Sequence, residues 1–453
     1  MRSKRTLLGA VLLPLALLAA ACGGDDDGGQ TASTEPAASE NGDEQATETG
    51  STEPAASENG DEQATETAST EPTASENGDE QVSEGASDEV AGTIKIAAQS
   101  PATGPAAGIG EVWKKGIEFG VAQVNANGGV VIDGERYEFE LSYQDNETNP
   151  ERAVGIAQEI LRDGTMFTFG PSVTTLFQPT WESLKGNDIM VFTATTLAQS
   201  LLGTPEAEYL ISTKVPDAGP DGAITANAAA IVGEWQPETV AILEPADPAG
   251  EVHIDAYVAA LEEAGVEVVY QDTFEGTTQD FAPFITSMQQ ADPDVVIIGY
   301  LDRWATPFLD QAAAAGFTEP HFALAPGVSL ASVQDRGDIS ASLIIPTRAV
   351  DNAEDETLAD FREAYAEEFG SDPGPADFWM LTYYDSVRML ARAMEIANSA
   401  TDLGAIADAL ATDEAAEYPG RALDLRIDEN GAATYPHQNA FVENGEITYV
   451  DAG

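Results

Sequence analysis

The feature that most constrains the fold is a regular alternation of short apolar runs and amphipathic stretches across residues 93–453. Runs such as 166–169 and 295–300 are short and apolar and suit buried strands. Stretches such as 251–264 repeat apolar residues three and four positions apart, as a helix with one buried face does. Such alternation favours parallel sheets joined by right-handed crossovers. Two successive series of alternating strands and helices predict an α/β chain with two doubly wound, Rossmann-like lobes.

The same patterns set approximate element positions. We expect strands at 93–98, 137–143, 166–169, 189–192, 209–215, 239–243, 266–270, 295–300, 321–324 and 342–345, and further short strands after Leu423. We expect helices at 111–127, 150–162, 221–235, 251–264, 281–290, 307–315, 357–369 and 376–397. Pro150 begins its helix because a first turn leaves its N–H groups unpaired, so the proline loses no bond there. Gly116 and Gly120 lie on the first helix, where we expect them to permit close packing rather than bind phosphate.

Residues 1–22 have the layout of a secretory signal peptide. Arg2, Lys4 and Arg5 form a basic start, and an apolar run follows that is too short to span a membrane comfortably. Small residues lead to Cys22, the only cysteine of the chain. This arrangement resembles a bacterial lipobox, which implies cleavage before Cys22 and lipid on its sulfur. The alternative is an ordinary secretory signal with an incidental cysteine.

Residues 23–92 consist largely of a polar repeat with an 18-residue period, which begins at Ser33, Ser51 and Ser69. The repeat contains acids but no lysine or arginine, and it has too few apolar side chains to build a core. We therefore expect a disordered acidic linker that tethers a globular part to the membrane face.

Charge and motifs exclude several classes of function. A net charge of −60 is the opposite of what a nucleic-acid-binding protein needs. A single cysteine allows no intramolecular disulfide, and three histidines far apart in the chain give no metal motif. The sequence has no phosphate-binding loop, dinucleotide fingerprint or nucleophile elbow. We expect no cofactor and no metal, and a binding protein rather than an enzyme.

One stretch, residues 166–180, combines a buried strand with a helix start. Ser172, Thr174 and Thr175 follow the strand and precede the apolar stripe of the helix. Ligands of open α/β sheets bind outside the carboxyl ends of strands, and a helix start attracts anions. These hydroxyls are therefore candidates for holding a small carboxylate. The alternative is that they only cap the helix.

Several stretches together resemble the branched-chain amino-acid (leucine/isoleucine/valine) family of ABC-transporter substrate-binding proteins. The resemblance rests on the order and spacing of loose motifs at 93–96, 101–105, 116–129, 143–150, 281–285, 293–299 and 383–387. It implies a type I periplasmic-binding-protein fold, in which three chain crossings form a hinge and the lobes close on a solute. The implied first lobe is 93–215 with 327–425, and the second is 216–326 with 426–453. The implied crossings lie near Val215-Pro216, near 325–327 and around 423–428.

The resemblance also implies ligand-binding positions. The family holds the ligand carboxylate with hydroxyls after the third and fourth strands, which here match Thr174 and Thr175, and Thr195 and Thr196. Ser100 and Thr103 lie in the first loop facing the ligand. Several donors of this kind suit a buried carboxylate, because they offset its loss of hydration.

The sequence departs from the family where the ligand ammonium is bound. Family members place an acid after the strand at 295–299, whereas an ungapped match puts Trp304 there, after Asp302 and Arg303. Asp302 is one candidate for the ammonium. Alternatively, Arg303 binds a second anion and Trp304 stacks on a ring, or Trp304 only packs within the lobe.

The resulting expectation is a lipid-anchored, monomeric solute receptor on the extracytoplasmic face of the cell membrane. It would bind a branched-chain amino acid or related small carboxylate and deliver it to the permease subunits of an ABC importer. The alternatives are a ligand-sensing receptor that feeds a signalling partner, a binder of an aromatic acid or amide, an enzyme and a purely structural surface protein.

Overall fold

The computed structural model describes residues 89–219, 222–299, 301–324, 328, 333, 336, 339–346, 358–373 and 378–451, all within one compact unit, 79–453. The expected signal peptide, Cys22 and the repeats of the linker lie outside the described residues. Strand β1 (Val90–Ser100) begins inside the expected linker 23–92, because Val90 and Gly92 already pair with β3. The globular part therefore begins before Thr93.

The first sheet has six strands in the order β2-β3-β1-β4-β5-β6. Besides β1, its strands are β2 (Val130–Ile132), β3 (Glu135–Asp145), β4 (Phe167–Phe169), β5 (Met190–Thr193) and β6 (Leu210–Ser212). Strands β3, β1, β4, β5 and β6 are all parallel, as the alternation predicted. The chain adds β3 on one side of β1 and then β4 on the other, so the strand order reverses at β1.

The second sheet has seven strands in the order β15-β14-β11-β10-β9-β7-β8. They are β7 (Thr239–Pro245), β8 (Glu267–Phe274), β9 (Val295–Ile298), β10 (His321–Leu324), β11 (Ala341–Pro346), β14 (His437–Glu443) and β15 (Glu446–Asp451). Strands β8 to β11 form a parallel block around β7, where the order again reverses. A separate short pair joins β12 (Arg426–Ile427) to β13 (Ala433–Thr434).

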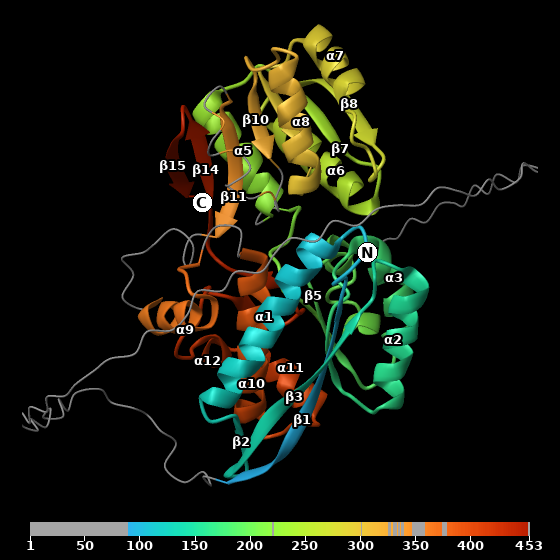
Figure 1. Cartoon of the computed structure of the whole chain (residues 1–453), viewed down its shortest axis with the longest axis vertical. Helices are drawn as coiled ribbons and strands as arrows, with labels where there is room; N and C mark the ends of the chain where they lie inside the picture. The colour runs from blue at the N-terminus through green and yellow to red at the C-terminus, as the bar shows by residue number, and fades with distance from the viewer. Residues whose placement is uncertain are drawn as a thin grey trace, which may run out of the picture. The chain divides into compact units, whose positions relative to one another are not determined.

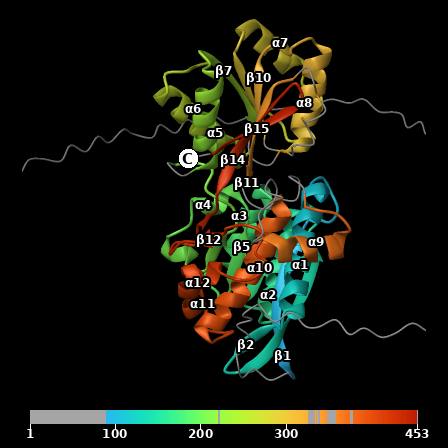
Figure 2. The same ribbon diagram turned by 90° about the vertical axis from the view of Figure 1, so that its left-hand side faces the viewer.

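Antiparallel hairpins extend one edge of each sheet, which the parallel prediction did not include. Asp133-Gly134 links β2 to β3, and Asn444-Gly445 links β14 to β15. All four turn residues have positive φ, between 52° and 80°. Two-residue hairpin turns require this backbone conformation, and asparagine, aspartate and glycine adopt it at least cost. Figure 2 shows β14 and β15 beside β11.

Helices cover both faces of each sheet (Figure 1). Those packed on the first sheet are α1 (Ala107–Ala126), α2 (Pro150–Arg162), α3 (Thr174–Leu184), α4 (Thr196–Gln199) and α10 (Phe378–Ala397). Outside this layer, α9 (Ala359–Phe369) packs on α1 and α10, and α11 (Leu403–Leu410) packs on α10. Those packed on the second are α5 (Ala223–Trp235), α6 (Pro248–Glu263), α7 (Ala282–Ala291) and α8 (Asp302–Ala314). The short η1 (Pro205–Ala207) and α12 (Asp413–Ala416) complete the set. No helix in these described ranges is both long and apolar enough to cross a bilayer.

The two glycines on α1 lie where the helix meets α10. A Cβ at Gly116 would come within 2.1 Å of the carbonyl oxygen of Met380, and one at Gly120 within 2.9 Å of Val387. No side chain fits at such distances without moving one helix. This confirms that the pair permits close packing.

Two segments belong to different sheets from those that the sequence indicated. Strand β11 was expected with 327–425 in the first lobe, but it pairs with β10 in the second sheet. The segment 426–434 was expected in the second lobe, but Ile427 and Ala433 are buried in the core of the first sheet. Sequence periodicity shows which side chains are buried, but it does not identify the neighbouring strand.

Candidate functional site

A binding site is expected where the order of the strands in each sheet reverses. In open α/β sheets, ligands bind outside the carboxyl ends of strands at such a point. In the first sheet, Ser100 ends β1 and Ser172 follows β4. In the second sheet, Glu244 lies near the end of β7, and α8 begins after β9. Most of the predicted residues therefore lie at these strand ends, although many of their polar atoms bind the protein itself.

Ser100 and Thr103 tie the loop after β1 to α1 and β3. The buried Ser100 Oγ donates to the carbonyl of Gly110 at 2.9 Å and lies 2.8 Å from the Tyr143 hydroxyl. The exposed Thr103 Oγ1 donates to the carboxylate of Asp145 at 2.7 Å. Backbone N–H groups of Ala102 and Thr103 donate to the same carboxylate. These contacts fix the loop after β1.

Ser172 is buried and holds two strand ends together. Its Oγ accepts from the backbone N–H of Ala194 at 2.9 Å and lies 3.3 Å from Thr193 Oγ1. It also bonds to the Tyr383 hydroxyl, whose pKa burial raises. With three partners in the protein, Ser172 has a structural role in this conformation.

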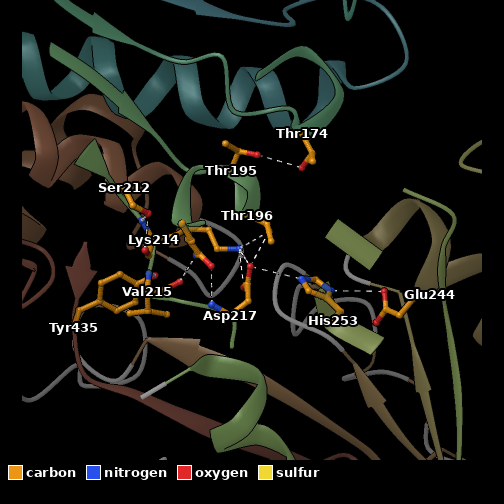
Figure 3. A network of polar contacts seen from close by, with 11 residues as sticks. Thr174, Thr195, Thr196, Ser212, Lys214, Val215, Asp217, Glu244, His253 and Tyr435 are labelled. Carbon is orange, nitrogen blue, oxygen red and sulfur yellow. Dashed lines mark hydrogen bonds and ion pairs between the residues drawn. The ribbon is translucent and has the colours of Figure 1, made fainter. Parts of the chain in front are cut away.

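Thr174 and Thr195 form a pair between two helix starts. Thr195 Oγ1 donates to Thr174 Oγ1 at 3.3 Å, as Figure 3 shows. Thr174 is the first residue of α3 and Thr195 the N-cap of α4, and each helix start lacks a side-chain cap bond. The N-cap of α3 is Val173, so the hydroxyls of residues 172–175 do not cap that helix. Thr175, the next residue, is exposed.

The second-lobe candidates lie in the first turn of α8. This helix begins at Asp302, five residues before the predicted start at Pro307, and the side chain of Asp302 is outside the description. Trp304 is 1% exposed, its Nε1 donates to the carbonyl of Gly276 at 3.0 Å, and its ring meets Phe274 edge-on. In this conformation its ring is packed in the core of the second sheet. The guanidinium of the exposed Arg303 lies 4.1 Å from the Trp304 ring centroid and donates to the Pro105 carbonyl at 3.3 Å.

A buried polar cluster, the crossing cluster, lies where the chain passes from β6 to α5. It consists of Thr196, Lys214, Asp217, Glu244 and His253 (Figure 3). Lys214 Nζ lies 2.7 and 2.8 Å from the two carboxylate oxygens of Asp217. Thr196 Oγ1 donates to the same carboxylate at 2.7 Å and accepts from Lys214 Nζ at 3.2 Å. Thr196, predicted to bind the ligand carboxylate, thus binds an internal one here.

His253 extends the cluster into the second sheet. Its Nε2 lies 3.8 Å from Asp217 Oδ2, and its Nδ1 lies 3.7 Å from Glu244 Oε2. Burial alone would lower the pKa of His253, but Asp217 and Glu244 outweigh it and raise that pKa to about 9. Burial would raise the pKa of Asp217, but Lys214 and His253 hold it well below its usual range. Burial raises the pKa of Glu244, and this effect is larger than the lowering effect of His253.

Sequence reasoning missed Lys214, Asp217, Glu244 and His253. One signal was present, because Lys214 is one of only six lysines and lies three residues before Asp217, next to the expected crossing at Val215-Pro216. For Glu244 and His253 the sequence offers no comparable signal. Three histidines far apart in the chain argued against a histidine site, whereas the partners of His253 are carboxylates from other segments. Among the described residues, no group of three or more histidine, cysteine or acidic side chains is arranged to hold a metal.

Comparisons with known proteins agree with this architecture. The family model described as "Periplasmic binding protein" matches residues 93–442. A Leu/Ile/Val-binding protein of Rhizobium johnstonii, BraC3, is 27% identical over 321 residues, which cover 70% of this chain and 83% of the relative.

Two solved structures have the same fold at low sequence identity. The leucine binding protein LivK of Thermotoga maritima has a TM-score of 0.65 and 20% identity, and the match covers 79% of this chain and 97% of LivK. An ABC-transporter solute binding protein of R. palustris in complex with benzoate has a TM-score of 0.65 and 14% identity, covering 80% and 96% of the two chains.

Proposed function

Because the chain belongs to the periplasmic binding protein family and has the type I fold of that family, we propose that it delivers a small carboxylate solute to an ABC importer. The proposed solute is a branched-chain amino acid, as the name of the Rhizobium relative suggests. A family of solute-binding proteins gives no support to an enzymatic role. We propose that ATP hydrolysis belongs to partner subunits and that this chain acts as a monomer.

The observation that carries the proposed solute is the Thr174–Thr195 pair. Both hydroxyls lie at helix starts that follow neighbouring parallel strands, β4 and β5. A carboxylate placed there would receive hydroxyl donors together with the N–H groups and positive dipole ends of the helices. The exposed Thr175 would be a further donor. Ser100, Thr103, Ser172 and Thr196 would support this site by fixing its loops.

We propose that each sheet with its helices is one lobe, which revises the predicted boundaries. The first lobe then comprises 90–212 with 358–434, and the second 223–346 with 437–451. Asp302 remains the proposed partner of a ligand ammonium, and the alternative is that Arg303 binds a second anion. Both belong to the first turn of α8, which follows β9 at the reversal point of the second sheet.

A thermal-shift measurement on the full chain tests the proposed solute. At about 100 times its dissociation constant, a ligand adds about 2.7 kcal/mol to the free energy of unfolding. We expect leucine, isoleucine or valine to raise the melting temperature, and Thr195→Val to weaken that binding by about 1–3 kcal/mol because one donor to the carboxylate is lost.

Thr286→Val is the matched control, because this exposed hydroxyl donates only within α7. Unchanged leucine affinity in Thr195→Val would show that the carboxylate lies elsewhere. A shift with benzoate but with no amino acid would replace the amino-acid solute by an aromatic acid.

We also propose that lipid on Cys22 anchors the chain to the extracytoplasmic membrane face. The support is the signal-like segment 1–22 that ends at the only cysteine. Cys22→Ser is expected to move the chain from the membrane fraction to the soluble fraction, because it removes the site of the proposed lipid and the apolar run of residues 1–22 is too short to span a bilayer comfortably. Quantitative immunoblotting of both fractions measures this. An unchanged distribution would favour the incidental cysteine.

A further inference from the structure

The crossing cluster joins groups from both sheets around one histidine. Thr196 and Lys214 come from the first-sheet side, Glu244 and His253 from the second, and Asp217 lies in the segment between β6 and α5. We propose that this cluster binds a proton on His253 when the two proposed lobes are in contact at the cluster, and that it releases this proton when the lobes separate. On the proposed function, solute binding then takes up this proton.

Asp217 is held mainly from the first-sheet side. Its carboxylate receives Lys214 Nζ and Thr196 Oγ1, and its backbone N–H donates to Gln199 Oε1 at 3.0 Å. Ser212 Oγ donates to the Lys214 carbonyl at 2.9 Å and steadies the same segment. A movement of the second sheet would therefore leave Asp217 with these partners and carry His253 away from it.

His253 is the group whose charge depends on that contact. It is 2% exposed and lies between two carboxylates, at 3.8 Å from Asp217 and 3.7 Å from Glu244. A buried imidazolium needs such partners, because burial without them costs several kcal/mol. Both carboxylate oxygens of Glu244 are buried without a hydrogen bond, so its interaction with His253 is electrostatic. Contact between the sheets thus favours the protonated ring.

Tyr257 of α6 is also buried, burial raises its pKa, and its hydroxyl donates to Asn227 Oδ1 at 2.8 Å. Most other ionisable groups near α6 are exposed. The elements packed against α6 are α3, α4, α5, β7 and β8. On these elements, Glu182 of α3, Glu234 of α5, and Glu267 and Asp272 of β8 are exposed, and α4 carries no charge. On α6 itself, Glu251, Asp255, Glu262 and Glu263 are exposed. Asp247, the N-cap of α6, acts on Glu244 and raises its pKa. The buried carboxylates that act on His253 are Asp217 and Glu244.

The sign of the pH dependence follows from the direction of the shift. The pKa of His253 is raised from 6.5 to about 9, so the proton favours contact fully below pH 6.5. This preference is lost as the pH rises through 9. Separation removes Asp217 from His253, whereas Glu244 moves with the ring. The upper limit, reached if the pKa of His253 returns fully to 6.5, is a change of about 40-fold in the equilibrium between contact and separation from pH 7 to pH 9.

NMR titration of the full chain tests the first half of the proposal without any ligand. The sequence has only three histidines, and the pKa values of His321 and His437 are lowered. With 13C-labelled histidine, we expect one ring to titrate near pH 9 and two below pH 6.5. His321→Gln and His437→Gln assign the signals and leave the cluster intact. Titration of His253 at or below 6.5 would overturn the proposal.

Spin labels test the second half. Exposed Glu182 on α3 and Asp255 on α6, each replaced by cysteine in a Cys22→Ser background, report the separation of the sheets. We expect longer distances at pH 10 than at pH 7 in the ligand-free chain, and no such change in His253→Gln. Identical distance distributions at both pH values would overturn the proposal.

Leucine then tests the coupling to binding. If leucine binds, its affinity should fall by at least about threefold from pH 7 to pH 9, which is well within the linkage limit, and His253→Gln should remove this dependence. Pronounced pH dependence that survives in His253→Gln would contradict the coupling. Failure of leucine to bind at all counts against the proposed solute, and the two ligand-free measurements still decide the role of His253.

Discussion

Replacing Lys214 with methionine is expected to lower the free energy of unfolding by about 3–5 kcal/mol, because it leaves the fully buried carboxylate of Asp217 without its closest cation. The two carboxylate oxygens lie 2.7 and 2.8 Å from Lys214 Nζ, while His253 is 3.8 Å away. Urea denaturation followed by circular dichroism measures the change.

Lys185→Met is the matched control for Lys214. Its ammonium group pairs with Glu182 at 2.9 Å and Glu206 at 3.5 Å, but it is partly exposed, so we expect a change below about 1 kcal/mol. The double variant Lys214→Met with Asp217→Leu should recover part of the lost stability, because the buried carboxylate that lost its cation is then absent, while His253 keeps Glu244 as its partner. A loss of less than about 1 kcal/mol in Lys214→Met alone would show that the pair contributes no more than a surface ion pair.

Trp304→Ala is expected to lower the free energy of unfolding by about 3–5 kcal/mol, because it removes a large side chain from the core of the second sheet. The indole packs edge-on against Phe274 and donates to the carbonyl of Gly276. Its removal also leaves that acceptor without the indole donor. Urea denaturation again gives the change, and Trp235→Ala provides the comparison, since Trp235 is only half-buried and should cost less.

The same position also distinguishes packing from ligand recognition. Trp304→Phe keeps most of the apolar contact and should fold, so its affinity for leucine and benzoate can be measured. With a packing role, both affinities stay close to those of the original chain. A Trp304→Ala variant of unchanged stability, together with loss of benzoate binding in Trp304→Phe, would restore the ring-stacking alternative.

Local sequence patterns identified most of the parallel strands and their helices. The helix at 150–162 has the predicted bounds, and the Asn149 side chain accepts from the N–H of Arg152 at its start, where Pro150 has no N–H that needs an acceptor. Buried runs such as 295–298 became central strands of a parallel sheet. These successes share one reason: strand and helix periods, caps and turn residues act over a few neighbouring residues.

The position of Trp304 depended on a longer-range effect. Proline suits a helix start, so Pro307 marked the expected beginning of the helix at 307–315. The helix instead begins at Asp302 and contains Pro307, so Trp304 and Phe308 both belong to its buried side and Trp304 meets Phe274. The start of the helix at Asp302 allows this aromatic face to be buried. No local sequence pattern around Pro307 indicates that start.

By itself, the sequence determined the α/β class, the resemblance to the family and the hydroxyls at the strand ends, because each can be read from local patterns and from their order along the chain. Only the tertiary structure decided that β11 joins the second sheet and that Thr196 binds Asp217. It also brought Lys214 and His253 to that carboxylate, and Glu244 to the other ring nitrogen of His253, from segments up to 39 residues apart. The sequence does not show whether a charged side chain is hydrated at the surface or paired with another charge in the interior. Only the packing of the folded chain distinguishes these two situations.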